Sequence, residues 1–96
     1  MSSKNDFQIG PLIQQFLRDQ GLETPLNEYR IVQAWPEVAG KVIEKYTGQV
    51  FVKNRILNVQ IRSASLKHNL SMGRAILTKK LNDFVGADVI SDIRFY

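Results

Sequence analysis

The chain contains few side chains that could take part in covalent catalysis. His68 is the only histidine, cysteine is absent, and the serines close to His68 are explained more simply as helix caps. A nucleophile and its general base also need a carboxylate to orient them. No acidic residue lies between Glu44 and Asp83, so this stretch offers none. We therefore expect that the protein is not an enzyme.

Metal ligands are equally scarce, because one histidine without cysteine leaves only scattered carboxylates. Asp88 and Asp92 are four residues apart in a predicted strand, which places them on one face but more than one side chain apart. There is no P-loop and no GxGxxG sequence. We expect neither a metal site nor a cofactor.

Binding chemistry comes instead from cations. Residues 1–40 carry three basic and five acidic side chains, a net charge of −2, whereas residues 41–96 carry ten and four, a net charge of +6. The acid-free interval holds eight cations: Lys45, Lys53, Arg55, Arg62, Lys67, Arg74, Lys79 and Lys80. Such a run indicates affinity for a polyanion. The alternative is a solvated basic surface that serves solubility.

Several of these side chains lie on a predicted β-hairpin. Residues 47–53 and 56–62 flank Asn54-Arg55, a two-residue turn in which asparagine tolerates positive φ. The turn pairs Lys53 with Ile56, and further along it pairs Val50 with Val59. One face is then apolar, and the other collects Gln49, Phe51, Lys53, Asn58, Gln60 and Arg62, with Ile56 near the turn.

The mixed character of the polar hairpin face suggests a binding site. Phe51 could stack a nucleic-acid base while Lys53 and Arg62 hold phosphates. The simpler alternative is an ordinary exposed phenylalanine, or one that another element or a partner protein covers.

Residues 63–86 predict the longest helix, capped by Ser63 or Ser65 and ended by Gly86. An apolar stripe follows one side, cations project beside it, and Lys80 lies closer to the far side. The candidate partners for phosphate or carboxylate groups are therefore Lys53, Arg55, Arg62, Lys67, Arg74 and Lys79.

Two helices are predicted before the hairpin. We expect residues 1–6 to be disordered and residues 7–96 to form a single domain. The first helix covers residues 9–21, with Pro11 in its first turn and Gly21 as its C-cap. Thr24-Pro25 supplies an N-cap and first position for the second.

The stretch AWPEVAG brings the only tryptophan next to a helix breaker. Pro36 cannot donate a backbone hydrogen bond, so we expect the helix to kink or restart at Trp35-Pro36, and Gly40 to allow a tight exit. Because an indole is costly to leave in water, Trp35 is predicted to anchor the core. Trp35, Pro36 and Gly40 are therefore assigned structural roles.

The last residues, VISDIRFY, are rich in β-branched and aromatic side chains and predict a final strand, with an edge of the sheet as its expected position. The predicted order is α-α-β-β-α-β. We expect an α+β fold in which a three-stranded sheet has its helices packed on one face.

The apolar runs are far shorter than the roughly 20 residues that span a bilayer, and the N-terminus lacks an apolar signal-peptide core. The absence of cysteine suits a reducing compartment. We expect a soluble, cytoplasmic protein that makes no membrane contact.

Four segments, in order, resemble the bacterial DciA-type domain family. They are Trp-x-x-Val-x-Gly at residues 35–40; Leu-Asn-Val-Gln-Ile at residues 57–61; residues 65–70 with Leu77, Leu81-Asn82 and Gly86; and Ile-Arg-Phe at residues 93–95. The resemblance covers nearly the whole chain. It implies a KH-like fold and a role in assisting the replicative helicase, including its delivery to DNA, without ATP hydrolysis by the protein itself. No Gly-x-x-Gly occurs, so the loop with which KH modules clamp a nucleic-acid backbone is absent.

The leading hypothesis is a non-enzymatic replication protein that binds the replicative helicase and assists its loading or activity on DNA, with weak contact to single-stranded DNA. One alternative is a sequence-tolerant module that binds single-stranded DNA or RNA without a helicase partner. Another is an interaction domain whose edge strand, at Tyr96, pairs with a second chain.

Overall fold

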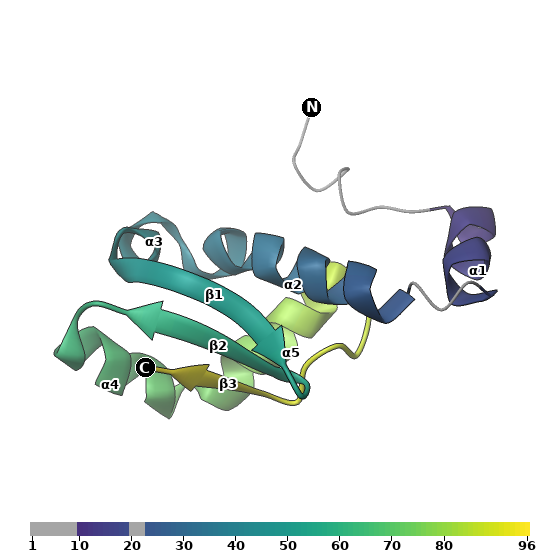
Figure 1. Cartoon of the computed structure of the whole chain (residues 1–96). Helices are drawn as coiled ribbons and strands as arrows, with labels where there is room; N and C mark the ends of the chain where they lie inside the picture. Colours follow the sequence, from purple (N-terminus) through teal and green to yellow (C-terminus); the bar gives the residue numbers. More distant parts are fainter. Residues whose placement is uncertain (1–9, 20–22) are drawn as a thin grey trace.

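A computed structural model describes residues 10–19 and 23–96. Eight elements follow one another in this part of the chain (Figure 1). They are α1 (Pro11–Asp19), α2 (Glu23–Ala39), α3 (Lys41–Tyr46), β1 (Thr47–Lys53), β2 (Ile56–Ile61), α4 (Ala64–Met72), α5 (Arg74–Val85) and β3 (Asp92–Phe95). The predictions for residues 1–6 and for Gly21 lie outside the described residues.

The three strands form one mixed sheet in the order β1-β2-β3, with β1 antiparallel and β3 parallel to β2. Figure 1 shows α5 behind this sheet, and α2 and α4 also pack on its helical side. The predicted α+β fold, with helices on one face of a three-stranded sheet, is confirmed, and a KH-like description fits it. Strand β3 is at an edge, as expected.

The hairpin has the predicted register, with Lys53 opposite Ile56, Val52 opposite Leu57 and Val50 opposite Val59. Both turn residues, Asn54 (φ 53°) and Arg55 (φ 63°), are left-handed. This is the turn geometry whose twist matches that of the flanking strands.

An irregularity in β1 follows Thr47, where Gly48 and Gln49 lie opposite Gln60. The Gln60 Oε1 atom accepts a hydrogen bond from the backbone N–H of Gln49 at 3.1 Å. It also occupies the space that a Cβ on Gly48 would need. A Cβ atom on residue 48 would therefore displace the side chain of Gln60 from this hydrogen bond.

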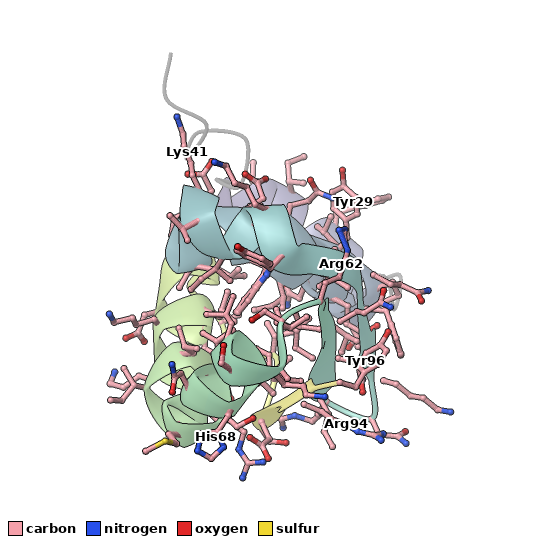
Figure 2. The ribbon with its side chains drawn as sticks, turned by 90° about the vertical axis from the view of Figure 1, so that its left-hand side faces the viewer. Tyr29, Lys41, Arg62, His68, Arg94 and Tyr96 are labelled. Carbon is pink, nitrogen blue, oxygen red and sulfur yellow. The ribbon has the colours of Figure 1, made fainter. Side chains whose placement is uncertain are left out.

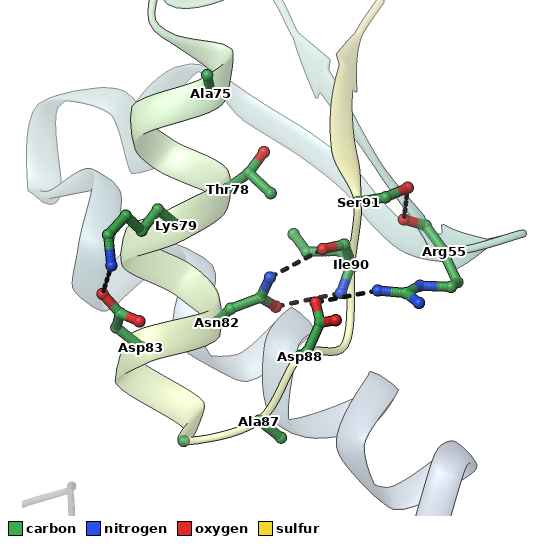
Figure 3. Close-up of a pocket in the computed structure, with 11 residues that line it drawn as sticks. Arg55, Ala75, Thr78, Lys79, Asn82, Asp83, Ala87, Asp88, Ile90 and Ser91 are labelled. Atoms are coloured by element: carbon green, nitrogen blue, oxygen red, sulfur yellow. Dashed lines mark hydrogen bonds and ion pairs between the residues drawn. The ribbon is translucent and has the colours of Figure 1, made fainter.

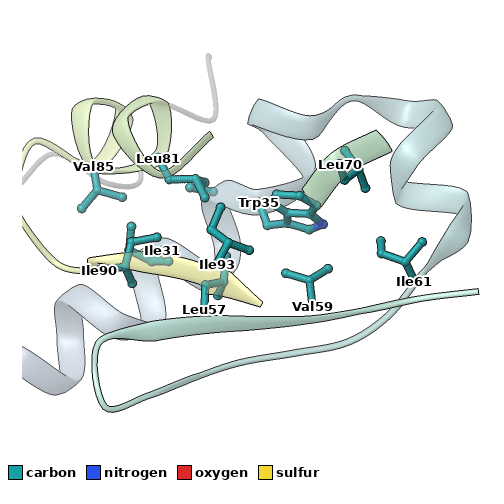
Figure 4. Close-up of a cluster of buried hydrophobic side chains, with 11 residues drawn as sticks. Ile31, Trp35, Leu57, Val59, Ile61, Leu70, Leu81, Val85, Ile90 and Ile93 are labelled. Atoms are coloured by element: carbon teal, nitrogen blue, oxygen red, sulfur yellow. The ribbon is translucent and has the colours of Figure 1, made fainter. Parts of the chain in front are cut away.

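The core lies between the sheet and the helices (Figure 4). It contains Ile31, Ala34 and Trp35 from α2, three residues of β2, and apolar side chains of α4, α5 and the last segment. The largest fully buried side chains are Trp35, Ile31, Leu57, Leu81, Ile90, Ile93 and Val59. A chain of this size has a small core, so each of these side chains contributes appreciably to stability.

Of the two predicted outcomes at Trp35-Pro36, a kink or a restart, the restart is wrong, because α2 continues through Pro36 to Ala39. The carbonyl of Pro36 accepts a hydrogen bond from the N–H of Gly40 at 3.0 Å. Continuing the helix packs Val38 and Ala39 against the core, which offsets the bond that proline cannot make. The chain changes direction at Gly40, whose φ of 94° is unfavourable for other residues, and α3 follows without having been predicted.

The long helix was also predicted incorrectly, because it is two helices that meet at Gly73. The N–H of Gly73 bonds to the carbonyl of Leu70 and tightens this turn. Ser63 caps α4 through a bond from the N–H of Leu66 to its Oγ, and a left-handed Gly86 ends α5, as predicted.

Two boundaries differ from the prediction. The helix α2 begins at Glu23, so Thr24 already lies inside it and does not cap it. The strand β3 begins at Asp92, so Asp88 does not share a strand with Asp92. Residues 88–90 instead form a connection that the side chain of Asn82 holds.

Candidate nucleic-acid and partner interface

The face of the sheet opposite the helices, called the outer face below, carries the polar side of the hairpin and is extended by β3. Because β3 pairs with β2 so that Arg94 lies opposite Asn58, Arg94 and Tyr96 point to the same side as Phe51. The outer-face side chains used in the following argument are Gln49, Phe51, Lys53, Asn58, Gln60, Arg62, Arg94 and Tyr96.

Two aromatic rings meet on the outer face. The ring centroids of Phe51 and Tyr96 are 6.4 Å apart in an edge-to-face arrangement, and each residue is 37% exposed. Strand β1 supplies the first ring, and the second follows β3. The backbone of Tyr96 extends the ladder, because its N–H bonds to Val59 and its carbonyl accepts from Ile61. Both rings therefore belong to residues whose backbone is hydrogen-bonded to β2.

Three cations surround this aromatic pair. Figure 2 shows Arg62, Tyr96 and Arg94 one below another on the sheet side of the molecule. Arg62 donates from Nη2 to the carbonyl of Thr47 at 3.0 Å, which holds its guanidinium at the end of the sheet. Among the described residues, neither Lys53 nor Arg94 forms an ion pair with a carboxylate, so both charges can meet a ligand.

Three of the four remaining candidate cations have an acidic neighbour, and for Arg55 and Arg74 this neighbour is distant in the sequence. Arg55 contacts Asp88 at 3.0 Å, Arg74 contacts Asp92 at 3.6 Å, and Lys79 contacts Asp83 at 2.8 Å. The hydrogen bond and charge of Asp83 raise the pKa of Lys79. These pairs are exposed and hence weak, but each reduces the positive field of its cation.

The seven predicted binding residues therefore fall into two groups. Phe51, Lys53 and Arg62 lie together on the outer face, with Arg55 at the adjoining turn. Lys67, Arg74 and Lys79 lie on α4 and α5, and Lys67 is half-buried. Their roles in binding stay predictions.

Sequence reasoning missed Arg94 and Tyr96 as members of this surface. The signal was the alternation of IRFY, in which Ile93 and Phe95 face the core while the residues between and after them face outward. The alternation alone could not show that β3 pairs with β2.

The chain that folds in this way also matches the model of a known protein family. The family model DciA, described as Dna[CI] antecedent, matches residues 8–95. The chain belongs to the DciA family. The match covers nearly the whole chain and confirms the resemblance, and membership implies a role related to helicase loading. No curated protein matches the chain.

The Trp-x-x-Val-x-Gly segment of this DciA family member is part of its framework. The indole of Trp35 is 1% exposed, and its Nε1–H donates to Thr47 Oγ1 at 3.2 Å. The hydroxyl of Thr47 in turn donates to the carbonyl of Ile43 at 2.8 Å. This chain of bonds ties α2, α3 and β1 together, and the ring of Phe95 packs 5.8 Å from the indole.

The Leu81-Asn82 segment has a framework role as well (Figure 3). Asn82 donates from Nδ2 to the carbonyl of Ile90 at 2.8 Å and accepts from the N–H groups of Val89 and Ile90 at 3.0 and 3.1 Å. It lines a shallow groove of about 860 Å³. The charges of Arg55 and Lys79 in the groove are balanced by those of Asp88 and Asp83, so the groove has no net charge that would attract a charged ligand.

Arg30 joins the same framework from α2. Its Nη2 donates to the carbonyl of Val85 at 2.8 Å, at the C-terminal end of α5, where a cation is favourable. Burial lowers the pKa of its guanidinium, which nevertheless remains charged. In the part of the chain that is described, no helix has the length and apolar character needed to cross a membrane.

Proposed function

We propose that this protein is a non-enzymatic accessory protein of DNA replication that binds the replicative helicase and assists its loading or activity on DNA. The observation that carries the proposal is the match of the DciA family over residues 8–95. Such a role would place the protein in the cytoplasm.

The side chains exposed on the surface support a role in binding. Large apolar side chains on α1, α4 and α5 remain exposed, including Leu12 (83%), Met72 (77%) and Ile76 (65%). Exposed apolar side chains suit contact with a protein. The cations of the outer face suit contact with DNA. The surfaces suited to the helicase and to DNA therefore lie on different elements.

The test is capture of the protein by the replicative helicase of the same organism, purified and immobilised, after nuclease treatment of both samples. Capture should survive nuclease, and addition of the protein should increase the amount of helicase bound to circular single-stranded DNA. Absence of capture in the presence and in the absence of nucleotide would contradict the proposal.

A module that binds single-stranded DNA or RNA without a helicase partner is the second candidate. The aromatic pair of Phe51 and Tyr96 among outer-face cations favours it. Binding to oligonucleotides together with failure of helicase capture would select this candidate.

A further inference from the structure

We propose that the outer face is a stacking platform for single-stranded DNA. Unpaired bases stack on Phe51 and Tyr96, while Lys53, Arg62 and Arg94 contact the phosphates on either side. The choice of DNA over RNA rests on the proposed function. The platform itself rests on the geometry of the sheet.

Two amide side chains of the face already form hydrogen bonds within the protein. Asn58 is 8% exposed, and its Nδ2 donates to the carbonyl of Ile56 at 3.0 Å. The Oε1 atom of Gln60 accepts from the N–H of Gln49. These bonds reduce the number of hydrogen-bonding groups with which the face could read base edges. What remains for a ligand is aromatic surface and positive charge, a combination that binds without sequence preference.

The rings are held in place before a ligand arrives. Phe51 and Tyr96 touch edge to face, so each restricts the rotation of the other. Their backbone is fixed in the ladder by the bonds between Tyr96 and β2. Stacking a base on such a ring costs little side-chain entropy compared with stacking on an isolated ring.

The charges have a spacing that fits a nucleic-acid strand. Lys53 is two residues from Phe51 along β1, and Arg94 is two residues from Tyr96, so each cation lies about 7 Å along the strand from a ring. The carboxylate of Asp92, at the start of β3, is paired with Arg74. The phosphate backbone would therefore meet Lys53 on β1, Arg62 directly after β2 and Arg94 on β3.

Single-stranded DNA fits this face better than two other polyanions. A duplex keeps its bases stacked on one another, so the rings would gain nothing from it. An acidic peptide would use the cations but lacks the extended π-faces that match two adjacent rings. Duplex DNA and an acidic peptide therefore serve as comparison ligands in the test.

The experiment measures binding of the full chain to a fluorescent oligothymidylate of about 12 nucleotides, within the site sizes of small single-strand-binding folds. We expect Phe51→Leu and Tyr96→Leu each to weaken binding by about fivefold or more, because stacking on an aromatic ring is lost. The wild type should bind an abasic strand of the same length more weakly than it binds the oligothymidylate. The double variant with Phe51→Leu and Tyr96→Leu should bind the two strands equally.

Charge variants provide the second measurement. Each of Lys53→Gln, Arg62→Gln and Arg94→Gln should reduce the slope of log K against log salt concentration by about 0.7, because one phosphate contact disappears. Lys80→Gln removes the same charge from an exposed residue of α5 that is not among the candidate binding residues, and it should leave the slope unchanged. Thermal unfolding of every variant establishes that it is folded. If a ring variant does not fold, the Arg94 and Lys53 variants still test the platform.

The platform is overturned if folded ring variants bind the oligothymidylate as well as the wild type does. It is also overturned if an equal length of duplex or an acidic peptide binds more tightly. Helicase capture is measured separately with the same variants. Loss of capture by the wild type contradicts the proposed function alone, whereas ring-independent DNA binding with intact capture contradicts the platform alone.

Discussion

At the scale of single residues, Asn82 does more for the fold than its polar side chain suggests. Its amide joins α5 to the segment before β3 through three hydrogen bonds. One partner, Ile90, is 1% exposed, so its backbone groups have no access to water. The side chain therefore fixes how β3 enters the sheet, and with it the position of Arg94 and Tyr96.

We expect Asn82→Ala to lower the free energy of unfolding by about 2–4 kcal/mol, because buried backbone groups lose their partners. Urea denaturation measures the change. Asp83→Asn is the control on the same helix. It removes only the exposed pair with Lys79, so its effect should stay within about 0.5 kcal/mol. Equal effects of the two variants would contradict this role of Asn82.

Thr47 provides the partner that the buried indole of Trp35 needs. Thr47→Val keeps the shape of the side chain but leaves Nε1–H without an acceptor, so we expect a loss of about 1–3 kcal/mol. Thr47→Ser keeps the hydroxyl and should be less destabilising. Chemical denaturation followed by tryptophan fluorescence compares the two, and the opposite ranking would show that the hydroxyl contributes little.

At the scale of elements, the hairpin turn stores strain at a residue that is not glycine. Arg55 has a φ of 63°, in the left-handed region that costs most residues about 1–2 kcal/mol. Its carbonyl accepts a bond from the N–H of Ser91 at 2.8 Å, which ties the turn to the segment before β3. That contact and the pairing of β1 with β2 hold the residue in place.

Arg55→Gly should therefore be more stable than Arg55→Ala by about 1 kcal/mol, measured by thermal or urea unfolding. Both variants lose the exposed pair with Asp88, so their difference isolates the cost of the Cβ atom. If the alanine variant is equally stable, the turn is not strained.

At the scale of the whole molecule, the sheet has one face covered by helices and one face free. The helix α1 stands apart from this arrangement, beyond the end of α2 (Figure 1). Its side chains Leu12 (83%), Ile13 (55%) and Phe16 (57%) are exposed and absent from the core. The buried core of the described residues thus lies between the sheet and the helices α2, α4 and α5.

We expect the double substitution Leu12→Ser and Phe16→Ser to change the free energy of unfolding by less than about 0.5 kcal/mol. Ile31→Ala, which opens a cavity in the core, should cost about 2–5 kcal/mol. Urea denaturation of both proteins tests the contrast. A large loss in the α1 variant would mean that α1 packs on the body in solution.

The sequence by itself determined the features that depend on near neighbours. Alternation of apolar and polar residues specified the hairpin register, because a slip by one residue would expose the apolar set of Val50 and Val59. The capping residues Ser63 and Gly86 marked their helix ends through local hydrogen bonds and backbone freedom. The family resemblance was also visible at this level, since it depends on ordered short segments.

Only the tertiary structure decided the features that depend on distant residues. Packing of Val38 and Ala39 carried α2 through Pro36 against its local preference. Folding brought Asp88 to Arg55 and Asp92 to Arg74, whereas the pair of Lys79 with Asp83 is local to α5. The candidate site depends on the same cause, because the parallel pairing of β3 with β2 places Tyr96 beside Phe51. Which strand lies beside which is set by the burial of the whole core, and no short segment contains that information.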